Sequence, residues 1–314
     1  MDKERLLLEA RRRLERVGFK TSSLNYRPVG RRKALDLIAV KGKELLIIKG
    51  SENTTTIMEN ETRELKAISR VFNGKSLIVS RKFHSRALED YILYERHKIP
   101  TVTPKGLEML VSGELYVYSN RGGYFVNING RVLRKAREER GLSLGDLACI
   151  LGVSRKAIYE YERGSISASI NVALKLIEIF GEEVIEPLSL ERLDEERKHE
   201  SLLVKTSIPD INVEEKLMKK LRRLGLVSIH TRTTPVDIIA KDPSEGKTLI
   251  FTVDHGADDH LESKINAAVK MSRAIGLKVT ALVSKSRLKS LEIPEDCLQL
   301  TYDEVEKLTE KDLL

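Results

Sequence analysis

The sequence has only two cysteines among its 314 residues, Cys149 and Cys297, and neither has metal-ligating neighbours at a suitable spacing. A zinc module and a disulfide framework are therefore excluded, and we expect both cysteines to be buried apolar residues. No apolar run approaches the roughly 18 residues of a membrane span, and no signal-peptide pattern is present. We expect a cytoplasmic, soluble protein with no membrane partner.

The composition predicts a globular chain of two or three domains, because 41% of its residues are apolar and it is long. Its net charge of +8 is uneven: residues 1–129 contain 25 Lys and Arg against 15 Asp and Glu, whereas residues 201–314 contain 18 of each. A basic front half fits a polyanionic partner, although a well-hydrated surface is equally compatible with charge alone. The acidic stretch 182–200 is interpreted as a linker or a solvated helix.

Residues 131–164, RVLRKAREERGLSLGDLACILGVSRKAIYEYERG, have the spacing of two short helices that cross at a tight turn. Ser143 and Asp146 form a capping-box pattern, Gly152 stands where a helix end tolerates positive φ, and Ser154 is a second N-cap candidate. Apolar residues recur at helical spacing: Leu147, Ala148, Leu151, Ile158 and Tyr161. Periodicity alone would also allow an ordinary helical hairpin within a larger domain.

Together with the downstream stretch NVALKLIEIFG, this block resembles the lambda-repressor and Cro type of helix-turn-helix domain over residues 130–189. The matching motifs are LRxxREExGLS, LGVSRxxIxxxERG and LxLIxIFG. The sequence departs from that family at Leu144, where a phosphate-binding Gln is usual. It also departs at residues 165–168, where a basic Lys/Arg-Asn-Pro segment is usual.

The resemblance implies that the second helix enters the DNA major groove. Arg155 is then expected to read guanine, and Glu160 to accept a hydrogen bond from cytosine. The full set of predicted DNA-binding residues is Ser143, Ser154, Arg155, Lys156, Tyr159 and Glu160. The predicted partner is double-stranded DNA, bound by a homodimer on half-sites about one helical turn apart.

The two ends of the chain look like copies about 200 residues apart, by the order of matching segments within this one sequence. The matched pairs are LLEARRRLERVGFK with EEKLMKKLRRLGLV, LDLIA with VDIIA, ELLIIKG with TLIFTVDHG, RELKAISRVFNG with SKINAAVKMSRAIG, LIVSR with ALVSK, and TPKGLEML with TYDEVEKL. Each copy is predicted to be an α/β unit with a helix, a strand pair, a helix, a strand and a closing helix.

This order of elements resembles the restriction-endonuclease and Holliday-junction-resolvase fold. Its nuclease motif needs two carboxylates to hold magnesium and a lysine to stabilise charge or activate water. In the front copy Asp36 and Lys49 match, but Ile47 occupies the second acidic position. Glu44 lies three residues too early to replace it, and Glu64 is interpreted as a solvated helical charge.

In the rear copy Asp237 matches, while Thr252 and Asp254 are read as replacing the acid and the lysine. Both copies are therefore predicted to be degenerate, with Asp36 and Asp237 capped or salt-bridged at strand ends. We expect no catalytic residues, no metal ligands, no cofactor and no enzymatic activity. The basic runs at 11–13 and 31–33 could touch phosphate, and the rear copy suits dimerisation or ligand sensing.

Residues 114–128 alternate around the turn at 120–123 and predict a β-hairpin, with cross-strand packing favoured over base stacking for its aromatic residues. Asn129 is the expected cap of the next helix. The predicted division is a nuclease-like domain at 1–113, a hairpin connector at 114–129, the helix-turn-helix domain at 130–189, a linker at 190–208 and a second nuclease-like domain at 209–314.

The predicted fold class is thus mixed: an all-α helix-turn-helix domain flanked by two α/β domains that resemble degenerate restriction-endonuclease-like folds. The whole chain resembles a group of archaeal transcriptional regulators. The resemblance implies sequence-specific DNA binding through the central domain, with flanking domains for dimerisation or sensing. The alternative is a DNA repair or nuclease-type factor that the helix-turn-helix targets to DNA. A toxin–antitoxin partner fits less well, since such antitoxins are much shorter.

Overall fold

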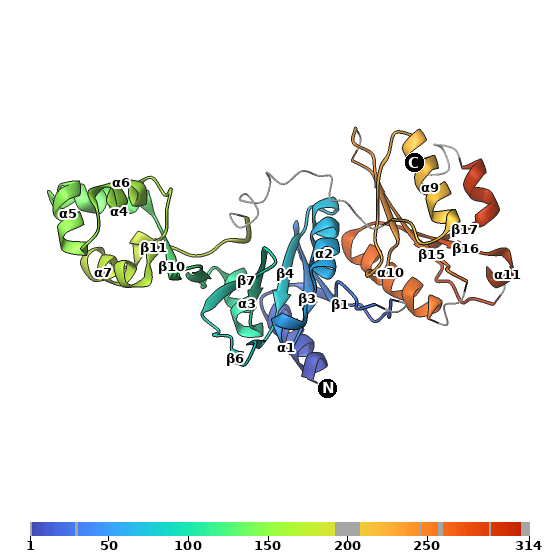
Figure 1. The fold of residues 1–314 in the computed structure, drawn as a ribbon, viewed down its shortest axis with the longest axis horizontal. Helices are drawn as coiled ribbons and strands as arrows, with labels where there is room; N and C mark the ends of the chain where they lie inside the picture. Colours follow the sequence, from blue (N-terminus) through green and yellow to red (C-terminus); the bar gives the residue numbers. More distant parts are fainter. Residues whose placement is uncertain are drawn as a thin grey trace.

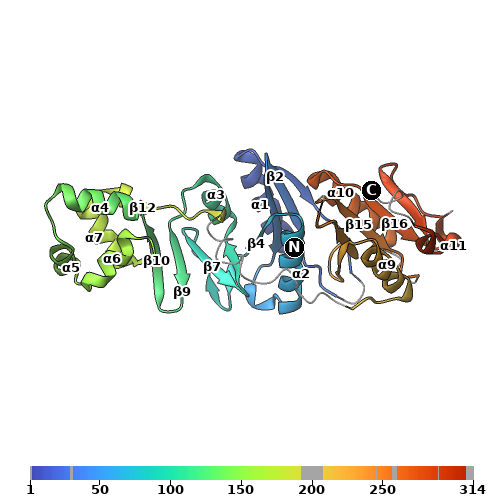
Figure 2. The same ribbon diagram turned by 90° about the horizontal axis from the view of Figure 1, so that it is seen from above.

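The computed structural model describes residues 2–28, 31–191, 208–244, 246–256, 260–288 and 290–308. Figures 1 and 2 show an elongated molecule with three units in line. A front α/β domain lies in the middle, a rear α/β domain lies at one end, and four helices lie at the other end: α4 (Gly130–Glu139), α5 (Leu144–Leu151), α6 (Arg155–Glu162) and α7 (Ile170–Phe180). The helix-turn-helix unit is central in the sequence but terminal in space. Within the described ranges, no helix is long and apolar enough to cross a membrane.

Five strands of the front domain, residues 2–112, have the order β1-β2-β3-β4-β8, and β7 continues the sheet by pairing antiparallel with β8. β1, β2 and β3 pair antiparallel, and β3, β4 and β8 pair parallel. Its elements are α1 (Asp2–Arg16), β1 (Lys20–Ser23), β2 (Leu37–Lys41), β3 (Glu44–Gly50), η1 (Thr54–Thr56), α2 (Glu59–Val71), β4 (Lys75–Val79), β5 (Lys82–Phe83), β6 (Arg86–Ala87), β7 (Ile92–Arg96), β8 (Ile99–Val102) and α3 (Pro104–Ser112).

Both faces of this sheet are buried, which explains why its strands are almost uninterrupted runs of apolar residues. Leu46 and Ile48 face one core together with Leu6 and Leu14 of α1, whereas Ile47 faces the opposite core. This alternation follows from the two-residue period of a strand.

The rear domain repeats the arrangement, with strands in the order β13-β14-β15-β16-β17 and the same succession of antiparallel and parallel pairs. The predicted duplication is confirmed, although each copy has a further strand before the predicted pair and the rear closing helix is a 3-10 helix. The elements are α9 (Asn212–Arg223), β13 (Val227–His230), β14 (Ile238–Lys241), β15 (Thr248–Val253), α10 (Leu261–Ile275), β16 (Val279–Val283), α11 (Lys285–Leu288), β17 (Cys297–Thr301) and η3 (Tyr302–Lys307).

The two α/β domains pack against each other through a shared apolar core. Ile47 and Ile68 of the front domain belong to the same buried cluster as Ile239, Ile265 and Ala268 of the rear domain. Helix α10 contacts β1 and β2. It lies beside β1 in Figure 1. Burial of this apolar surface stabilises the pair as one unit.

The front sheet continues without a break into the helix-turn-helix unit. β7 pairs parallel with β9 (Val117–Asn120), which forms the predicted hairpin with β10 (Gly123–Ile128). β10 then pairs with β11 (Ala168–Ser169) and β12 (Ile185–Glu186). The rings of Tyr118 and Phe125 lie 5.9 Å apart across the hairpin, as predicted. Backbone hydrogen bonds therefore hold the helical unit on the front domain.

Two expectations outside the sites need correction. Cys149 is exposed, because it lies on the outer side of its helix, away from buried Leu147 and Leu151; Cys297 is buried, which raises the pKa of its thiol to about 11. The described part of the acidic stretch is not solvated throughout, since Val184 is buried in the helical unit and Leu188 in the front core. Residues 192–207 of the predicted linker lie outside the described residues.

Candidate functional site

The helix-turn-helix motif consists of α5 (Leu144–Leu151) and α6 (Arg155–Glu162), preceded by α4 (Gly130–Glu139) and followed by α7 (Ile170–Phe180). Ser143 Oγ accepts a hydrogen bond from the Asp146 backbone at 3.1 Å, and the Asp146 carboxylate accepts one from the Ser143 backbone at 2.8 Å. This confirms the capping box, and the bonds lower the pKa of Asp146. Ser154 Oγ caps α6 by accepting from the Ala157 backbone.

The turn between the two helices has the predicted geometry. Gly152 adopts φ 71°, a left-handed conformation that suits glycine. Ile158 and Tyr161 of α6 are buried beside Leu147 and Leu151 of α5. Ile158 and Tyr161 therefore form the inner face of α6.

Helix α4 is held closely against α6. A Cβ atom on Gly130 would lie 2.3 Å from the Glu162 carbonyl oxygen, so this approach requires glycine. Arg137 of α4 and Glu162 form a bidentate pair at 2.5 and 3.1 Å, with both side chains about nine-tenths buried. Removing one partner of such a pair would leave the other charge unpaired in the interior. Asn129 caps α4 as predicted.

The outer face of α6 contains the side chains that the sequence selects for DNA. Arg155, Lys156 and Tyr159 are exposed, whereas Glu160 is half-buried. Ser143 and Ser154 are exposed at the two helix starts. All six predicted residues therefore lie on or at the edge of the motif, with Glu160 the least accessible.

Arg163 is not among the predicted DNA-binding residues, but it is exposed beside them. Its guanidinium lies 5.5 Å from the centre of the Tyr159 ring, close enough for a cation–π contact, and donates to the Tyr159 hydroxyl at 3.5 Å. The four-residue spacing from Tyr159 is the signal that could have found it, because such pairs share a helix face. Leu144, where the family has a phosphate-binding Gln, packs instead against the apolar core.

In the front nuclease-like site, lysine side chains lie around Asp36. Asp36, just before β2, accepts from the Gly50 backbone at 2.9 Å and lies 2.9 and 3.1 Å from the ammonium groups of Lys3 and Lys33. Burial opposes ionisation of Asp36, but these lysines and Lys49 outweigh it and hold its pKa below the usual value. The predicted salt-bridged aspartate is confirmed.

Lys49 is buried and pairs with Glu61 of α2 at 2.8 Å. Burial lowers the pKa of Lys49. Glu61 also accepts from the Met58 backbone and so closes the start of α2. Glu61 is thus a second carboxylate in the site. It comes from a helix, 12 positions after Lys49, so the spacing of residues along the strand does not predict it.

The interpretation of Glu64 as a solvated charge is wrong. Glu64 is buried, and its carboxylate accepts from the backbone of Arg232 at 3.0 Å and of Thr233 at 2.7 Å. Both donors belong to the loop between β13 and β14 of the rear domain. The rear domain therefore covers a face of α2 that would otherwise be exposed to solvent. The sequence of the front domain alone contains no signal for this contact.

The assignment of Thr252 and Asp254 as the replaced motif residues is also wrong. Ile238 pairs with Phe251 as Leu37 pairs with Ile48, so the equivalents of Ile47 and Lys49 are Ile250 and Thr252. The connection between β14 and β15 is longer than that between β2 and β3, which changes the spacing from the aspartate to the equivalent positions. Asp254 is buried and pairs with Arg287 at 2.8 Å.

The rear site takes its lysine from a helix. Lys264 of α10 reaches the two carboxylate oxygens of Asp237 at 2.8 and 2.7 Å, and the Val253 backbone donates to Asp237 at 2.6 Å. The predicted salt-bridged state of Asp237 is confirmed. Its burial nevertheless raises the pKa of Asp237 above the usual value, despite Lys264.

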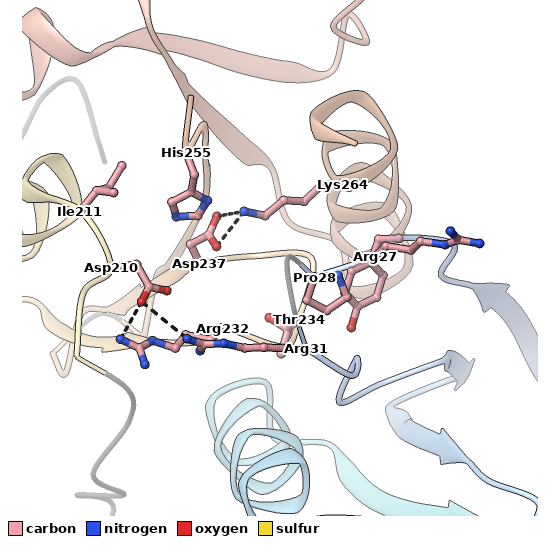
Figure 3. A pocket seen from close by; sticks show the side chains of 11 residues that line it. Arg27, Pro28, Arg31, Asp210, Ile211, Arg232, Thr234, Asp237, His255 and Lys264 are labelled. Atoms are coloured by element: carbon pink, nitrogen blue, oxygen red, sulfur yellow. Dashed lines mark hydrogen bonds and ion pairs between the residues drawn. The ribbon is translucent and has the colours of Figure 1, made fainter. Parts of the chain in front are cut away.

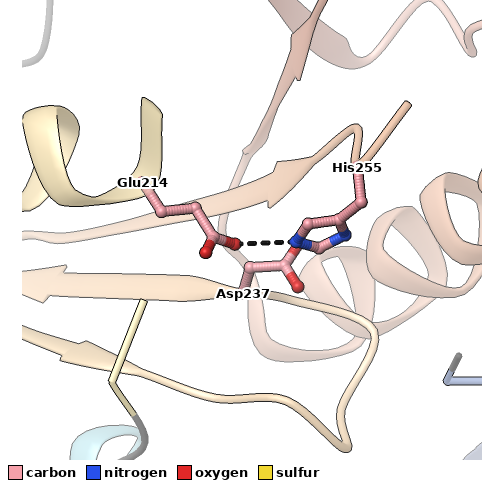
Figure 4. Close-up of side chains that lie close together, drawn as sticks. All are labelled: Glu214, Asp237 and His255. Atoms are coloured by element: carbon pink, nitrogen blue, oxygen red, sulfur yellow. Dashed lines mark hydrogen bonds and ion pairs between the residues drawn. The ribbon is translucent and has the colours of Figure 1, made fainter. Parts of the chain in front are cut away.

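Glu214, at the start of α9, completes this cluster (Figure 4). It lies 3.1 Å from His230 and 2.9 Å from His255. Burial opposes ionisation, but the hydrogen bonds from both histidines hold the pKa of Glu214 well below its usual range, and Glu214 in turn raises the pKa of His255. One ligand atom from each of Glu214, Asp237 and His255 lies within 4.8 Å of the others, so these residues could hold a metal ion. Any such ion would compete with Lys264 for Asp237.

A pocket of about 280 Å³ opens beside this cluster, between the front and rear domains (Figure 3). Its walls come from the loop after β1, the residues just before α9, the loop before β14, the loop after β15, and α10. The lining residues are Tyr26, Arg27, Pro28, Arg31, Asp210, Ile211, Arg232, Thr234, Asp237, His255 and Lys264.

The basic runs of the front domain are largely engaged within the protein. Arg13 bonds Glu9 and Glu108, at 3.0 and 2.6 Å. Lys33 pairs with Asp36, while Arg32 donates to the Thr56 carbonyl. These runs therefore have structural roles, and they offer few unpaired charges for phosphate.

Comparison with known families agrees with this architecture. Residues 3–116 match a PD-(D/E)XK superfamily domain, and residues 133–186 match a helix-turn-helix domain. A solved structure, the SinR protein/SinI protein complex, is similar at 22% identity over 31% of this chain and 82% of that chain, with a TM-score of 0.16, too low to support a structural comparison.

Several relatives share the name "Putative HTH-type transcriptional regulatory protein". That of Pyrococcus horikoshii is 32% identical over 88% of this chain and 85% of its own length. Those of Sulfurisphaera tokodaii and Saccharolobus solfataricus are 33% and 31% identical, covering 93% and 88% of this chain and 95% and 86% of theirs. The chain therefore belongs to this archaeal family of HTH-type transcriptional regulatory proteins.

Proposed function

We propose that this protein is a sequence-specific regulator of transcription that reads double-stranded DNA with α6. The observation that supports this most directly is the division of α6 into two faces. Ile158 and Tyr161 are buried, while Arg155, Lys156 and Tyr159 are exposed. The motif lies at the far end of the molecule from the rear domain, and neither α/β domain, as far as the structure describes it, covers the motif there (Figure 1).

The individual contacts follow from this placement. Arg155, in the first turn of α6, reads guanine through two parallel hydrogen bonds. Ser143 and Ser154 accept the capping bonds with their oxygen lone pairs, so each hydroxyl proton remains available for a phosphate oxygen. Arg163, steadied on the Tyr159 ring, adds a phosphate contact that partly replaces those lost at Leu144 and at 165–168. Glu160 makes a base contact only where its half-buried side chain reaches the groove.

We propose that the two nuclease-like domains are scaffolds without catalytic activity. In the front copy three lysines surround Asp36, and in the rear copy Lys264 forms a salt bridge with Asp237. A magnesium ion in either site would face these ammonium groups at close range. The boundaries proposed at 113, 129, 189 and 208 separate sequence segments, but the hairpin at 114–129 joins the first domain to the helices through one continuous sheet.

We further propose a homodimer that places two copies of α6 on adjacent half-sites. Within one chain, the faces on which the front and rear domains contact each other are already buried in a common apolar core. A dimer must therefore use a different surface, and a two-fold operator is the expected sign of it.

Selection of bound sequences from random duplexes tests the proposal. We expect enrichment of a two-fold symmetric site whose halves are about 10 base pairs apart. The control is the Arg155→Ala, Lys156→Ala double variant, which should enrich no sequence. Absence of any enrichment with the unmodified protein would refute sequence-specific recognition, and a single half-site would refute the dimer.

A further inference from the structure

We infer that the pocket between the front and rear domains binds a small phosphate-bearing metabolite that acts as an effector. The binding site stands on its own geometry. Only its role as a regulator of DNA binding rests on the proposed function.

The first observation is the charge of the pocket walls. Four cationic side chains line it, Arg27, Arg31, Arg232 and Lys264, against the two carboxylates of Asp210 and Asp237. Figure 3 shows Arg31 and Arg232 converging on Asp210, whereas the Arg27 guanidinium extends away from Asp237. Even without Arg27 the three other cationic side chains outnumber the two carboxylates.

The second observation is one buried donor, on a residue that lines the pocket, that the described part of the protein leaves unsatisfied. Arg232 binds Asp210 at 2.6 Å through its terminal nitrogen, but its Nε is buried and has no hydrogen-bond partner among the described residues. Arg31 reaches Asp210 at only 3.9 Å. His255, which is partly exposed, binds Glu214 through Nε2. A buried donor without a partner is uncommon in proteins and points to an additional ligand.

These donors suit a phosphate group better than a carboxylate. Two guanidinium groups and an imidazole approach from separate segments, and they match an anion with several oxygens that point in different directions. A volume of about 280 Å³ is at the small end for ligand sites, which favours a sugar phosphate or mononucleotide over a large cofactor.

The pocket also has a position from which it could influence the DNA-reading end. Arg31 belongs to the front domain and Arg232 to the rear domain, so one anion held by both would restrain the junction. The front domain is linked to α7 through β7, β9, β10 and β11 by backbone pairing. Binding at the junction is therefore expected to change the affinity for DNA.

Calorimetry with the full chain tests the site. The probes are inorganic phosphate, adenosine monophosphate and succinate, each titrated into the unmodified protein, Arg232→Gln and Arg31→Gln. The matched control is Arg273→Gln, an exposed arginine on α10 that pairs with Asp296 outside the pocket. We expect adenosine monophosphate to bind the unmodified protein and Arg273→Gln equally, and at least tenfold more weakly to each pocket variant.

Several results would overturn the inference: no binding of either phosphate probe at millimolar concentration, equally tight binding of succinate, or unchanged binding by both pocket variants. Binding of Zn²⁺ alone, lost in Asp237→Asn, without phosphate binding would assign the pocket to a metal instead. Thermal melting of each variant verifies that it is folded.

DNA affinity is measured separately, with and without adenosine monophosphate. Arg155→Ala should lose DNA binding and retain the phosphate site. If the unmodified protein binds phosphate but no DNA, the proposed function fails and the site stands. If it binds both but neither affects the other, the effector role is refuted.

Discussion

Glu64 of α2 accepts a hydrogen bond at 2.7 Å from the backbone N–H of Thr233, a residue 169 positions further along the chain. The same carboxylate also accepts from the Thr233 hydroxyl at 2.5 Å. One buried side chain thus joins the two nuclease-like domains, beside the apolar core that they share.

Replacing Glu64 with Gln should destabilise the protein by about 1–3 kcal/mol, since charge-assisted bonds become neutral and an amide N–H₂ group faces backbone donors. Urea unfolding measures the change. Glu59→Gln is the control, because Glu59 lies on the same helix with 74% of its side chain exposed and should shift the midpoint little. Equal midpoints for the two variants would show that the Glu64 contact does not hold the domains together.

Arg155→Ala should weaken binding to the selected DNA site by about 1–3 kcal/mol and binding to random duplex by much less, because a base contact is lost. Fluorescence anisotropy at one fixed salt concentration measures both affinities. Lys219→Ala, an exposed lysine on α9 of the rear domain, should change neither. Equal losses on both duplexes would mean that Arg155 contacts only phosphate.

Neither nuclease-like domain should cut DNA. Supercoiled and branched DNA incubated with the protein and magnesium should remain intact, because lysines already neutralise Asp36 and Asp237. Gel electrophoresis detects cleavage. Cutting that disappears in Asp36→Ala or Asp237→Ala would instead support the alternative of a repair or nuclease-type factor.

The sequence predicted the helix-turn-helix motif closely because its signals are local. The Ser143 capping box, the left-handed Gly152 and the Ser154 cap each involve residues within four positions of one another, and all three are present in the structure. The apolar period that places Ile158 and Tyr161 inside α6 is likewise a property of a single helix.

The nuclease-like sites could be predicted only in part. Asp36, Lys49 and Asp237 were found from strand spacing. Their partners Glu61 and Lys264 come from helices, and Glu214 comes from the first helix of the rear domain. No period relates residues on different elements, so these contacts become visible only when the elements are packed.

By itself, the sequence determined most of the elements, the duplication and the exposed face of α6, because hydrogen bonding and burial along one helix or strand follow the local order of residues. Tertiary structure decided how the units are arranged. It brought the front and rear domains together, placed the central motif at one end of the molecule, and changed Glu64 from an apparent surface charge into a link between domains. The pocket between Arg31 and Arg232 exists for the same reason, since its walls belong to two domains about 200 residues apart in the chain.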